Sequence, residues 1–240
     1  MTAWLRRIME TVANDTTQEI VQRRSLVLAP HPDDEVLGCG GTIARKAQQG
    51  TLASIVFLTD GRHGAQGPPE EVTALREAEA WQAAEALGLL PERLVFLRIE
   101  DGHLNAHLEQ AAHHVRRLVA SLDVSDLFVP YRREFHPDHL AAWRIGAASL
   151  PHHGRLYEYP IWFGPWLWER LGWKARVAAA THLMDAIHAV KFNITAVADL
   201  KRRALAAYRS QMAAFERQQP WGPTFLTNFL GDYEMFFVHR

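Results

Sequence analysis

Short apolar runs alternate with longer amphipathic segments through the first half of the chain, and this alternation limits the fold more than any other feature. The runs have the length of buried strands, and they occupy residues 25–29, 52–59, 93–99 and 126–131. The segments between them have helical periodicity, and they cover residues 35–49, 70–87 and 107–122. Strands that alternate with helices in this way predict an α/β, Rossmann-like three-layer fold with a mostly parallel sheet flanked by helices.

The two ends of the chain carry weaker signals. Residues 1–24 are predicted to form an N-terminal helical extension. Residues 155–240 are less regular, with a final helix over 199–217 and a last strand near 234–239. No internal repeat, low-complexity segment or linker divides the sequence, so we expect a single domain over residues 1–240.

Charge and composition exclude several classes of protein. Lysine plus arginine number 26 against 27 for aspartate plus glutamate, and a net charge of −1 lacks the basic surface of a nucleic-acid binder. The single cysteine, Cys39, excludes an internal disulfide framework and is typical of the reducing cytoplasm. The N-terminus does not resemble an export signal, and no segment reaches the roughly 20 apolar residues that span a bilayer. We therefore expect a soluble cytoplasmic protein.

Open parallel sheets bind ligands beyond the carboxyl ends of their strands, and this rule indicates which polar residues belong to a functional site. The chain has 13 histidines, which is a high number for 240 residues. Acids and histidines are densest in two of the loops that follow predicted strands, His31–Glu35 and Arg132–His139. The chemistry of the protein is expected where these two loops meet.

The first of these loops reads HPDDE, at residues 31–35. Helix capping and the helix dipole account for one or two acids at a helix start. They do not account for three adjacent acids with a histidine, whose mutual repulsion needs a compensating cation. Gly38, Gly40 and Gly41 lie inside the predicted helix and do not complete a G-x-G-x-x-G pattern, so we reject a dinucleotide site and expect close packing of the helix on the sheet.

The second loop contains HPDH, at residues 136–139. Together the two loops offer His31, Asp34 and His139, and two neutral imidazoles with one carboxylate form the open three-ligand set of a catalytic zinc. The cation would also relieve the repulsion among the acids. A hydrolase further needs a carboxylate base, an imidazole that stabilises the oxyanion and protonates the leaving group, and a carboxylate that orients the imidazole. The residues that remain for these roles are Asp33, His136 and Asp138.

The sequence resembles the LmbE-like, or PIG-L, family of zinc-dependent N-acetylglucosaminyl deacetylases. The resemblance rests on APHPDDEVLGCGGTIA at 29–44 and on HPDH at 136–139. Weaker similarities to the family are LTDG at 58–61, REAEAWQAAEALGL at 76–89, EDGHL at 100–104 and KRRALAAYRSQM at 201–212. The resemblance implies a metal-dependent amide hydrolase that removes an N-acetyl group from an amino sugar, glycan or glycosylated small molecule.

The resemblance also implies a role for each site residue. The implied zinc ligands are His31, Asp34 and His139. The implied catalytic residues are Asp33 as the general base, His136 as the acid and oxyanion partner, and Asp138 as the residue that orients His136. Arg76 matches an arginine that contacts the substrate in some members of the family.

Some features depart from the family or fit two explanations. Pro30 stands where the family more usually has alanine or glycine, which changes the loop entry but removes no ligand. The four tryptophans between 162 and 173 are explained by buried packing or a subunit interface, or by a lid that stacks on a sugar or covers an acyl chain. Arg62 and His63 either line the pocket or belong to a solvated loop.

Two other functions stay open. A metallophosphoesterase usually needs two metal ions and a basic residue for phosphate, whereas only one full ligand set is visible. A non-catalytic, metal-dependent sugar-binding module would have no use for a base and an acid. The deacetylase is therefore preferred, with Fe²⁺ or another divalent ion as an alternative to zinc. The sequence determines neither the N-acylated substrate nor whether the chain forms a homo-oligomer.

Overall fold

The structure is a computed structural model that describes residues 10–51, 53–162, 189–217 and 222–239. The strands are β1 (Asn14–Asp15), β2 (Ser25–Ala29), β3 (Ala53–Thr59), β4 (Leu94–Ile99), β5 (Asp126–Pro130), β6 (Arg155–Tyr159), β7 (Ala189–Asn193) and β8 (Tyr233–His239). The α-helices are α2 (Thr17–Gln22), α3 (Asp34–Gln48), α4 (Pro69–Ala86), α5 (Leu108–Ser121), α6 (Pro137–Ser149), α9 (Ala198–Ala207), α10 (Arg209–Arg217) and α11 (Gly222–Thr227). Short 3₁₀ helices are η1 (Pro91–Arg93), η2 (Leu104–His107) and η3 (Thr195–Val197).

The described residues form one eight-stranded sheet with the order β1-β7-β8-β6-β5-β2-β3-β4. Strands β2 to β6 pair in parallel, whereas β8 pairs antiparallel with β6 and β7. From the central β2, the chain passes to β3 and β4 on one side and then returns to β5 on the other. The carboxyl ends of β2 and β5 therefore lie beside each other at a topological switch point, where ligands bind in folds of this kind.

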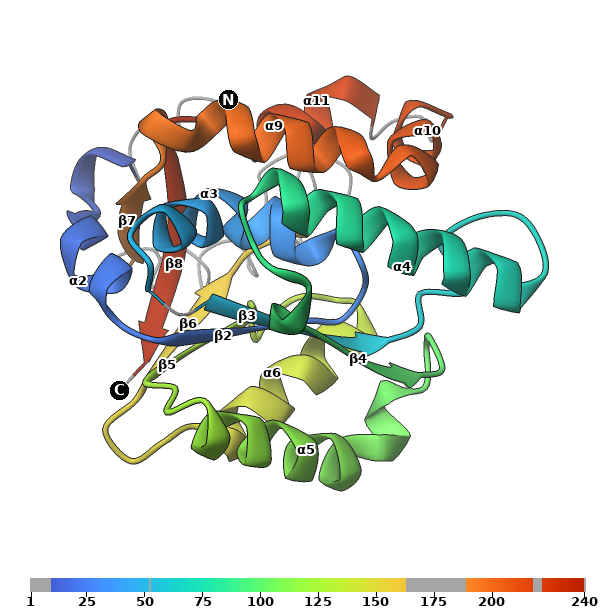
Figure 1. Cartoon of the computed structure of the whole chain (residues 1–240), viewed down its shortest axis with the longest axis horizontal. Helices are drawn as coiled ribbons and strands as arrows, with labels where there is room; N and C mark the ends of the chain where they lie inside the picture. Colours follow the sequence, from blue (N-terminus) through green and yellow to red (C-terminus); the bar gives the residue numbers. More distant parts are fainter. Residues whose placement is uncertain (1–9, 52, 163–188, 218–221, 240) are drawn as a thin grey trace, which may run out of the picture.

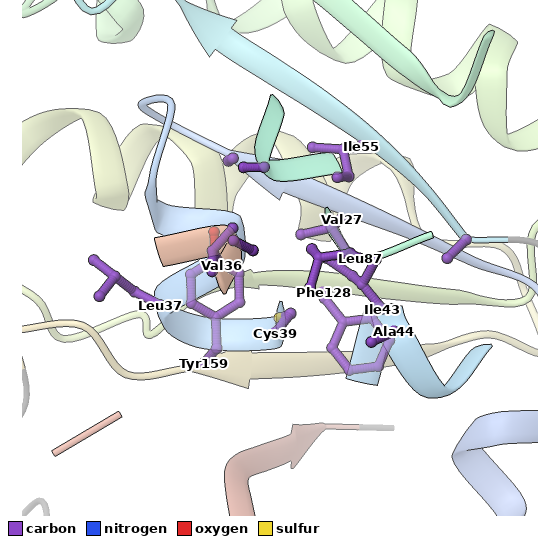
Figure 2. Close-up of a cluster of buried hydrophobic side chains, with 14 of the residues drawn as sticks. Val27, Val36, Leu37, Cys39, Ile43, Ala44, Ile55, Leu87, Phe128 and Tyr159 are labelled. Atoms are coloured by element: carbon purple, nitrogen blue, oxygen red, sulfur yellow. The ribbon is translucent and has the colours of Figure 1, made fainter. Parts of the chain in front are cut away.

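Helices cover both faces of the sheet, which confirms the predicted three-layer fold (Figure 1). Helices α3, α4 and α9 pack on one face, and α5 and α6 pack on the other. Figure 2 shows part of the first interface, where Cys39 and Ile43 of α3 lie near Val27 and Phe128 of the sheet. Within the part of the chain that the structure describes, no helix is both long and apolar enough to cross a membrane.

The glycines of α3 allow this helix to lie close to its neighbours. A Cβ atom on Gly38 would stand 2.3 Å from Cδ2 of Tyr159, and one on Gly41 would stand 2.3 Å from Cγ2 of Ile194. Both distances are far below van der Waals contact. The glycines therefore serve packing, as the sequence predicts.

The ends of the chain differ from the prediction. The first nine residues lie outside the described ranges. In the rest of the predicted helical extension, Thr17–Gln22 is helical as predicted, whereas Asn14–Asp15 forms an edge strand of the sheet. The described part of residues 155–240 contributes three strands, of which the sequence predicts only the last. The predicted helix over 199–217 is divided at Tyr208, a buried residue with ψ of 60°. A single domain over 1–240 stays a prediction.

Candidate metal centre and active site

The two motifs meet where β2 and β5 end. His31 lies just beyond β2, and Asp34 is the first residue of α3. His139 lies in the first turn of α6, which follows β5. Because β2 and β5 pair in parallel, both loops leave the sheet at the same edge.

Asp34 lies between the two histidines of the predicted ligand set. Its Oδ2 is 3.1 Å from Nδ1 of His31 and 3.3 Å from Nε2 of His139, and all three residues are buried. Ligand atoms about 2.0–2.1 Å from a tetrahedral zinc stand roughly 3.3 Å apart, so these separations fit a metal ion. Among the described residues, a second group with donor atoms within 4.8 Å of one another consists of His31, His136 and Asp138.

The charges around Asp34 favour a cation. Burial opposes a charge on His139, but Asp34 and Glu134 raise the pKa of this imidazole to about 9. Burial also opposes a charge on His31, yet hydrogen bonds to nearby carboxylates raise its pKa well above the usual value. Burial would raise the pKa of Asp34, but the two imidazoles lower it well below its usual range. Surroundings that stabilise positive charge on both histidines also stabilise a divalent metal ion.

The second ring nitrogen of His31 faces two carboxylates. Nε2 lies 3.1 Å from Oδ1 of Asp101 and 3.4 Å from Oδ2 of Asp138. The Asp138 carboxylate also accepts hydrogen bonds from the N–H groups of Gly102 at 2.7 Å and Leu104 at 3.2 Å. Sequence reasoning gives no role to Asp101, and its place in the EDGHL segment is the only signal for it.

Glu134 is a further site residue that sequence reasoning misses. It is buried, and its Oε2 lies 2.5 Å from Nδ1 of His139. Its Oε1 accepts hydrogen bonds from the N–H groups of Ile161 and Trp162. An acid two residues before HPDH, in a loop at the carboxyl end of a strand, is the signal that the sequence offers.

Asp33 lines one pocket together with His31, Asp34 and His139, but it belongs to neither group of metal donors among the described residues. Its φ of 137° lies in the region that favours glycine, and such strain is typical of functional sites. Nη2 of Arg76 lies 3.4 Å from Oδ1 of Asp33. Burial raises the pKa of Asp33 to about 7, with Arg76 opposing and Asp34 adding to the shift. A carboxyl group with this pKa is suited to exchange protons near neutral pH.

The third acid of the first motif supports the loop. Glu35 is buried, and its Oε2 accepts a hydrogen bond from the N–H of Asp33 at 3.0 Å. Its Oε1 accepts the hydroxyl hydrogen of Tyr208. Burial raises the pKa of Glu35 to about 8. The break between α9 and α10 at Tyr208 therefore brings a hydroxyl group to the strained turn at Asp33.

His136 is the N-cap residue of α6 and also lines the pocket. Its Nδ1 accepts a hydrogen bond from the backbone N–H of Asp138 at 3.3 Å, so the proton of the neutral ring lies on Nε2. Burial, followed by the charges of His31 and His139, lowers the pKa of His136 to about 4. The backbone N–H of Asp138 therefore contacts the His136 ring, while the Asp138 carboxylate faces His31, and the catalytic roles of His136 and Asp138 stay predictions.

Arg76 is buried between two loops. Its Nη1 donates to the carbonyl of Gly61 at 3.0 Å and its Nη2 donates to the carbonyl of Pro32 at 2.5 Å. Nε has no hydrogen-bond partner among the described residues. Arg76 therefore joins the loops that follow β2 and β3 while it lines the pocket. Its contact with a substrate stays a prediction.

The site residues line a pocket of about 310 Å³. The polar wall holds the histidines and carboxylates described above. The apolar wall is formed by Leu37, Ile161, Trp162 and Phe225. The ring centroid of Trp162 lies 5.2 Å from that of Phe225 and 5.5 Å from that of Phe135. Aromatic side chains together with polar groups in one pocket are suited to a sugar ring.

The other pocket predictions have mixed outcomes. His63 lines the pocket, whereas Arg62 donates to Oδ2 of Asp60 at 2.7 Å. Trp162 is the one tryptophan of the tryptophan-rich segment that belongs to the described residues. The other three, Trp166, Trp168 and Trp173, lie outside them.

A family model described as "PIG-L: GlcNAc-PI de-N-acetylase" matches residues 26–150. This range is more than half of the chain. It extends from β2 through α6 and contains both sequence motifs.

The chain is also similar to individual proteins. A probable N-acetyl-alpha-D-glucosaminyl L-malate deacetylase 2 from Bacillus cereus is 27% identical over 209 residues, which cover 81% of this chain and 86% of the relative. Among solved structures, the conserved protein TT1542 from Thermus thermophilus is 29% identical with a TM-score of 0.63, over 89% of this chain and 93% of that one. N,N'-diacetylchitobiose deacetylase from Pyrococcus horikoshii shares the fold at 22% identity, with a TM-score of 0.66 over 90% and 84% of the two chains.

Proposed function

Because the chain belongs to the PIG-L family of GlcNAc-PI de-N-acetylases, we propose that it uses zinc to remove the acetyl group from an N-acetylated amino sugar or glycoconjugate. The reaction is the hydrolysis of an amide, and its products are acetate and a free amine. One observation carries the proposal: a single pocket brings together a metal-donor group, the carboxyl group of Asp33 and the imidazole of His136.

His31, Asp34 and His139 would hold the zinc ion, because both imidazoles direct a nitrogen at the same carboxylate oxygen. Bound zinc supplies Lewis acidity toward a carbonyl oxygen and toward water. The second donor group is less suitable, since Nδ1 of His136 already accepts a hydrogen bond from the backbone N–H of Asp138. Replacing His139 by alanine should therefore remove the metal, whereas replacing His136 should leave it bound.

Asp33 is proposed as the base. Its carboxyl group lines the pocket next to the proposed ligand Asp34. It accepts a proton from the attacking water, and it returns this proton to the amine nitrogen as the carbon–nitrogen bond breaks. Acetate and the free amine then leave, and the Asp33 carboxylate is restored.

His136 is proposed to stabilise the oxyanion. With Nδ1 occupied by the Asp138 N–H, the proton on Nε2 is available for the oxygen atom on which negative charge develops. A neutral imidazole donates this hydrogen bond without giving up its proton. The role differs from the acid that the family resemblance implies, because Asp33 here supplies the proton for the amine.

The proposed substrate is an N-acetylglucosaminyl conjugate. The Bacillus cereus relative is a probable deacetylase of such a conjugate, and the pocket places Trp162 and Phe225 where a sugar face can stack. Arg76, which lines the pocket, is the proposed contact to the substrate. The cytoplasmic location stays a prediction.

Acetate release from a panel of N-acetylated amino sugars and glycoconjugates tests the proposal. The zinc-loaded protein should release acetate from at least one N-acetylglucosamine conjugate. The Asp33→Asn variant should bind zinc as the wild type does and turn over about 10²–10⁴-fold more slowly, which is the usual contribution of a positioned base. Zinc content by elemental analysis accompanies each assay.

The alternatives give different results. Phosphate release from phosphomonoesters without acetate release would indicate a metallophosphoesterase. Metal-dependent sugar binding without hydrolysis would indicate a binding module. Loss of zinc together with activity in Asp33→Asn would make Asp33 a ligand or a structural residue, and the assignment of the base would be wrong.

A further inference from the structure

Glu134 connects the candidate metal centre to the apolar wall of the pocket. It follows β5 in a turn, where its N–H donates to the carbonyl of Tyr131 at 3.1 Å, and its side chain has no exposed surface. One carboxylate oxygen faces His139, and the other faces the backbone of Ile161 and Trp162. We propose that Glu134 is a positioning residue that sets the ring of His139 for metal binding and anchors the pocket wall.

The hydrogen bonds decide which nitrogen of His139 is free for a metal. A carboxylate only accepts hydrogen bonds, so the contact of 2.5 Å places a proton on Nδ1 of His139. The lone pair of the neutral ring then lies on Nε2, which is the nitrogen that faces Oδ2 of Asp34 at 3.3 Å. Carboxylates bonded in this way to the second nitrogen of a ligand histidine fix its tautomer and orientation and raise its basicity. The inference rests on the proposed function only in taking His139 as a ligand.

The second oxygen of Glu134 holds the wall that faces the metal centre. Oε1 accepts hydrogen bonds from two successive N–H groups, at 2.5 Å from Ile161 and 3.0 Å from Trp162. Both residues line the pocket, and the indole of Trp162 lies against the ring of Phe225. The same buried carboxylate therefore sets the distance between a metal ligand and the apolar wall.

The two proposed ligand histidines differ in the carboxylates that face their second ring nitrogen. Nε2 of His31 faces both Asp101 and Asp138, so the loss of one carboxylate leaves the other in place. The contact of Glu134 with Nδ1 of His139, at 2.5 Å, is shorter than that of Asp101 with Nε2 of His31, at 3.1 Å. Glu134 also accepts the N–H of Trp162 in the pocket wall. We therefore expect Glu134→Gln to weaken zinc binding more than Asp101→Asn does.

Two substitutions separate the two roles of Glu134. In Glu134→Gln, the amide oxygen can still accept hydrogen bonds from Ile161 and Trp162, but the amide N–H₂ group faces the Nδ1 proton of His139. This variant should bind zinc about 10–100-fold more weakly, the usual effect of losing such a carboxylate, with an unchanged KM at saturating zinc. Glu134→Ala removes both contacts and should in addition raise KM.

The control is Glu158→Gln, which changes another fully buried carboxylate. Glu158 lies on β6 and accepts hydrogen bonds from Arg132 and from Nε1 of Trp143. Competition with a chromophoric chelator gives the zinc affinity of each variant in the absence of substrate. The control should stay within about twofold of the wild type, and circular dichroism should show that each variant is folded.

The results can also overturn the inference. A folded Glu134→Gln protein with wild-type zinc affinity, or a control that loses as much affinity, would contradict it. If neither Glu134 variant folds, the ¹⁵N chemical shifts of His139 in the zinc-loaded wild type decide, because the inference requires a protonated Nδ1. The zinc-affinity and chemical-shift measurements use no substrate, whereas the KM comparison, which tests the contact to Ile161 and Trp162, does. A protein that passes the two substrate-free measurements and releases no acetate would refute the proposed function and leave the role of Glu134 at His139 intact.

Discussion

Removing one partner of the buried ion pair that contacts the middle of α3 should strongly lower the free energy of unfolding. Glu234 on β8 accepts hydrogen bonds from the N–H groups of Gly41 and Thr42, at 2.7 and 2.8 Å, and from the Thr42 hydroxyl at 2.7 Å. Lys201 on α9 lies 2.7 Å from the same carboxylate and donates to the carbonyl of Leu37 at 2.8 Å. Both side chains are buried. The pair thereby joins the helix that begins at the first motif to an adjacent helix and strand.

The Lys201→Met substitution keeps most of the apolar stem of the side chain and removes the charge. It leaves the Glu234 carboxylate buried without its cation and the Leu37 carbonyl without the lysine. Removing one partner of a buried ion pair costs about 3–5 kcal/mol. Three hydrogen-bond donors still face the Glu234 carboxylate, so we expect the lower end of this range, about 3 kcal/mol.

Urea unfolding followed by circular dichroism measures the loss. The control is Arg202→Met at the neighbouring position, because Arg202 pairs with Asp199 while both side chains are more than half exposed. Exposed pairs contribute about 0–1 kcal/mol, so this variant should be close to the wild type. A loss below about 1 kcal/mol in Lys201→Met, or an equal loss in the control, would refute the reasoning.

Two further substitutions test packing and burial elsewhere. Alanine at Gly38 gains about 1 kcal/mol of helix propensity, but its Cβ would stand 2.3 Å from the buried ring of Tyr159, and overpacking costs about 1–3 kcal/mol. Gly38→Ala should therefore be less stable in urea, and a gain in stability would show that the helix can move away. Burial lowers the pKa of Lys46 to about 8, and its ammonium group donates to the carbonyls of Ile20 and Arg23. Between this pKa and the value near 10.4 of the unfolded chain, the unfolded state binds more protons, so the stability contributed at Lys46 rises with pH. Relative to Lys46→Met, the free energy of unfolding of the wild type, measured in urea titrations, should increase by on the order of 3 kcal/mol from pH 8 to 10.5. A difference between the two proteins that does not change with pH would contradict the lowered pKa.

The first half of the fold is predictable because each element carries its own periodic signal. The run Ser25–Ala29 is apolar because β2 is buried on both faces, and the helices on either side of the sheet keep one polar face. Parallel strands then require crossovers, so the order of elements nearly determines that the first and fourth predicted strands end at the same edge. The place of the two motifs follows from the sequence for this reason.

The second half lacks such signals. Strand β6 reads RLYEY, and its buried Glu158 breaks the apolar pattern expected of a strand in the interior of the sheet. That charge is stabilised by Arg132 and Trp143, which lie well before it in the chain. Partners so distant in sequence cannot be inferred from local periodicity. The same limit hides Glu134, whose contacts to Ile161 and Trp162 depend on how β6 ends.

Asp138 shows why a motif gives the position of a residue more reliably than its partner. Adjacent placement in HPDH suggests that the Asp138 carboxylate contacts the ring of His136. At a helix start, however, side chains two residues apart do not face each other, because each residue turns by about 100°. The carboxylate instead reaches the N–H groups of Gly102 and Leu104, and it faces Nε2 of His31. The second motif thereby brings the loop after β4 to the first motif, and the aspartate that the sequence assigns to the catalytic imidazole supports a proposed metal ligand.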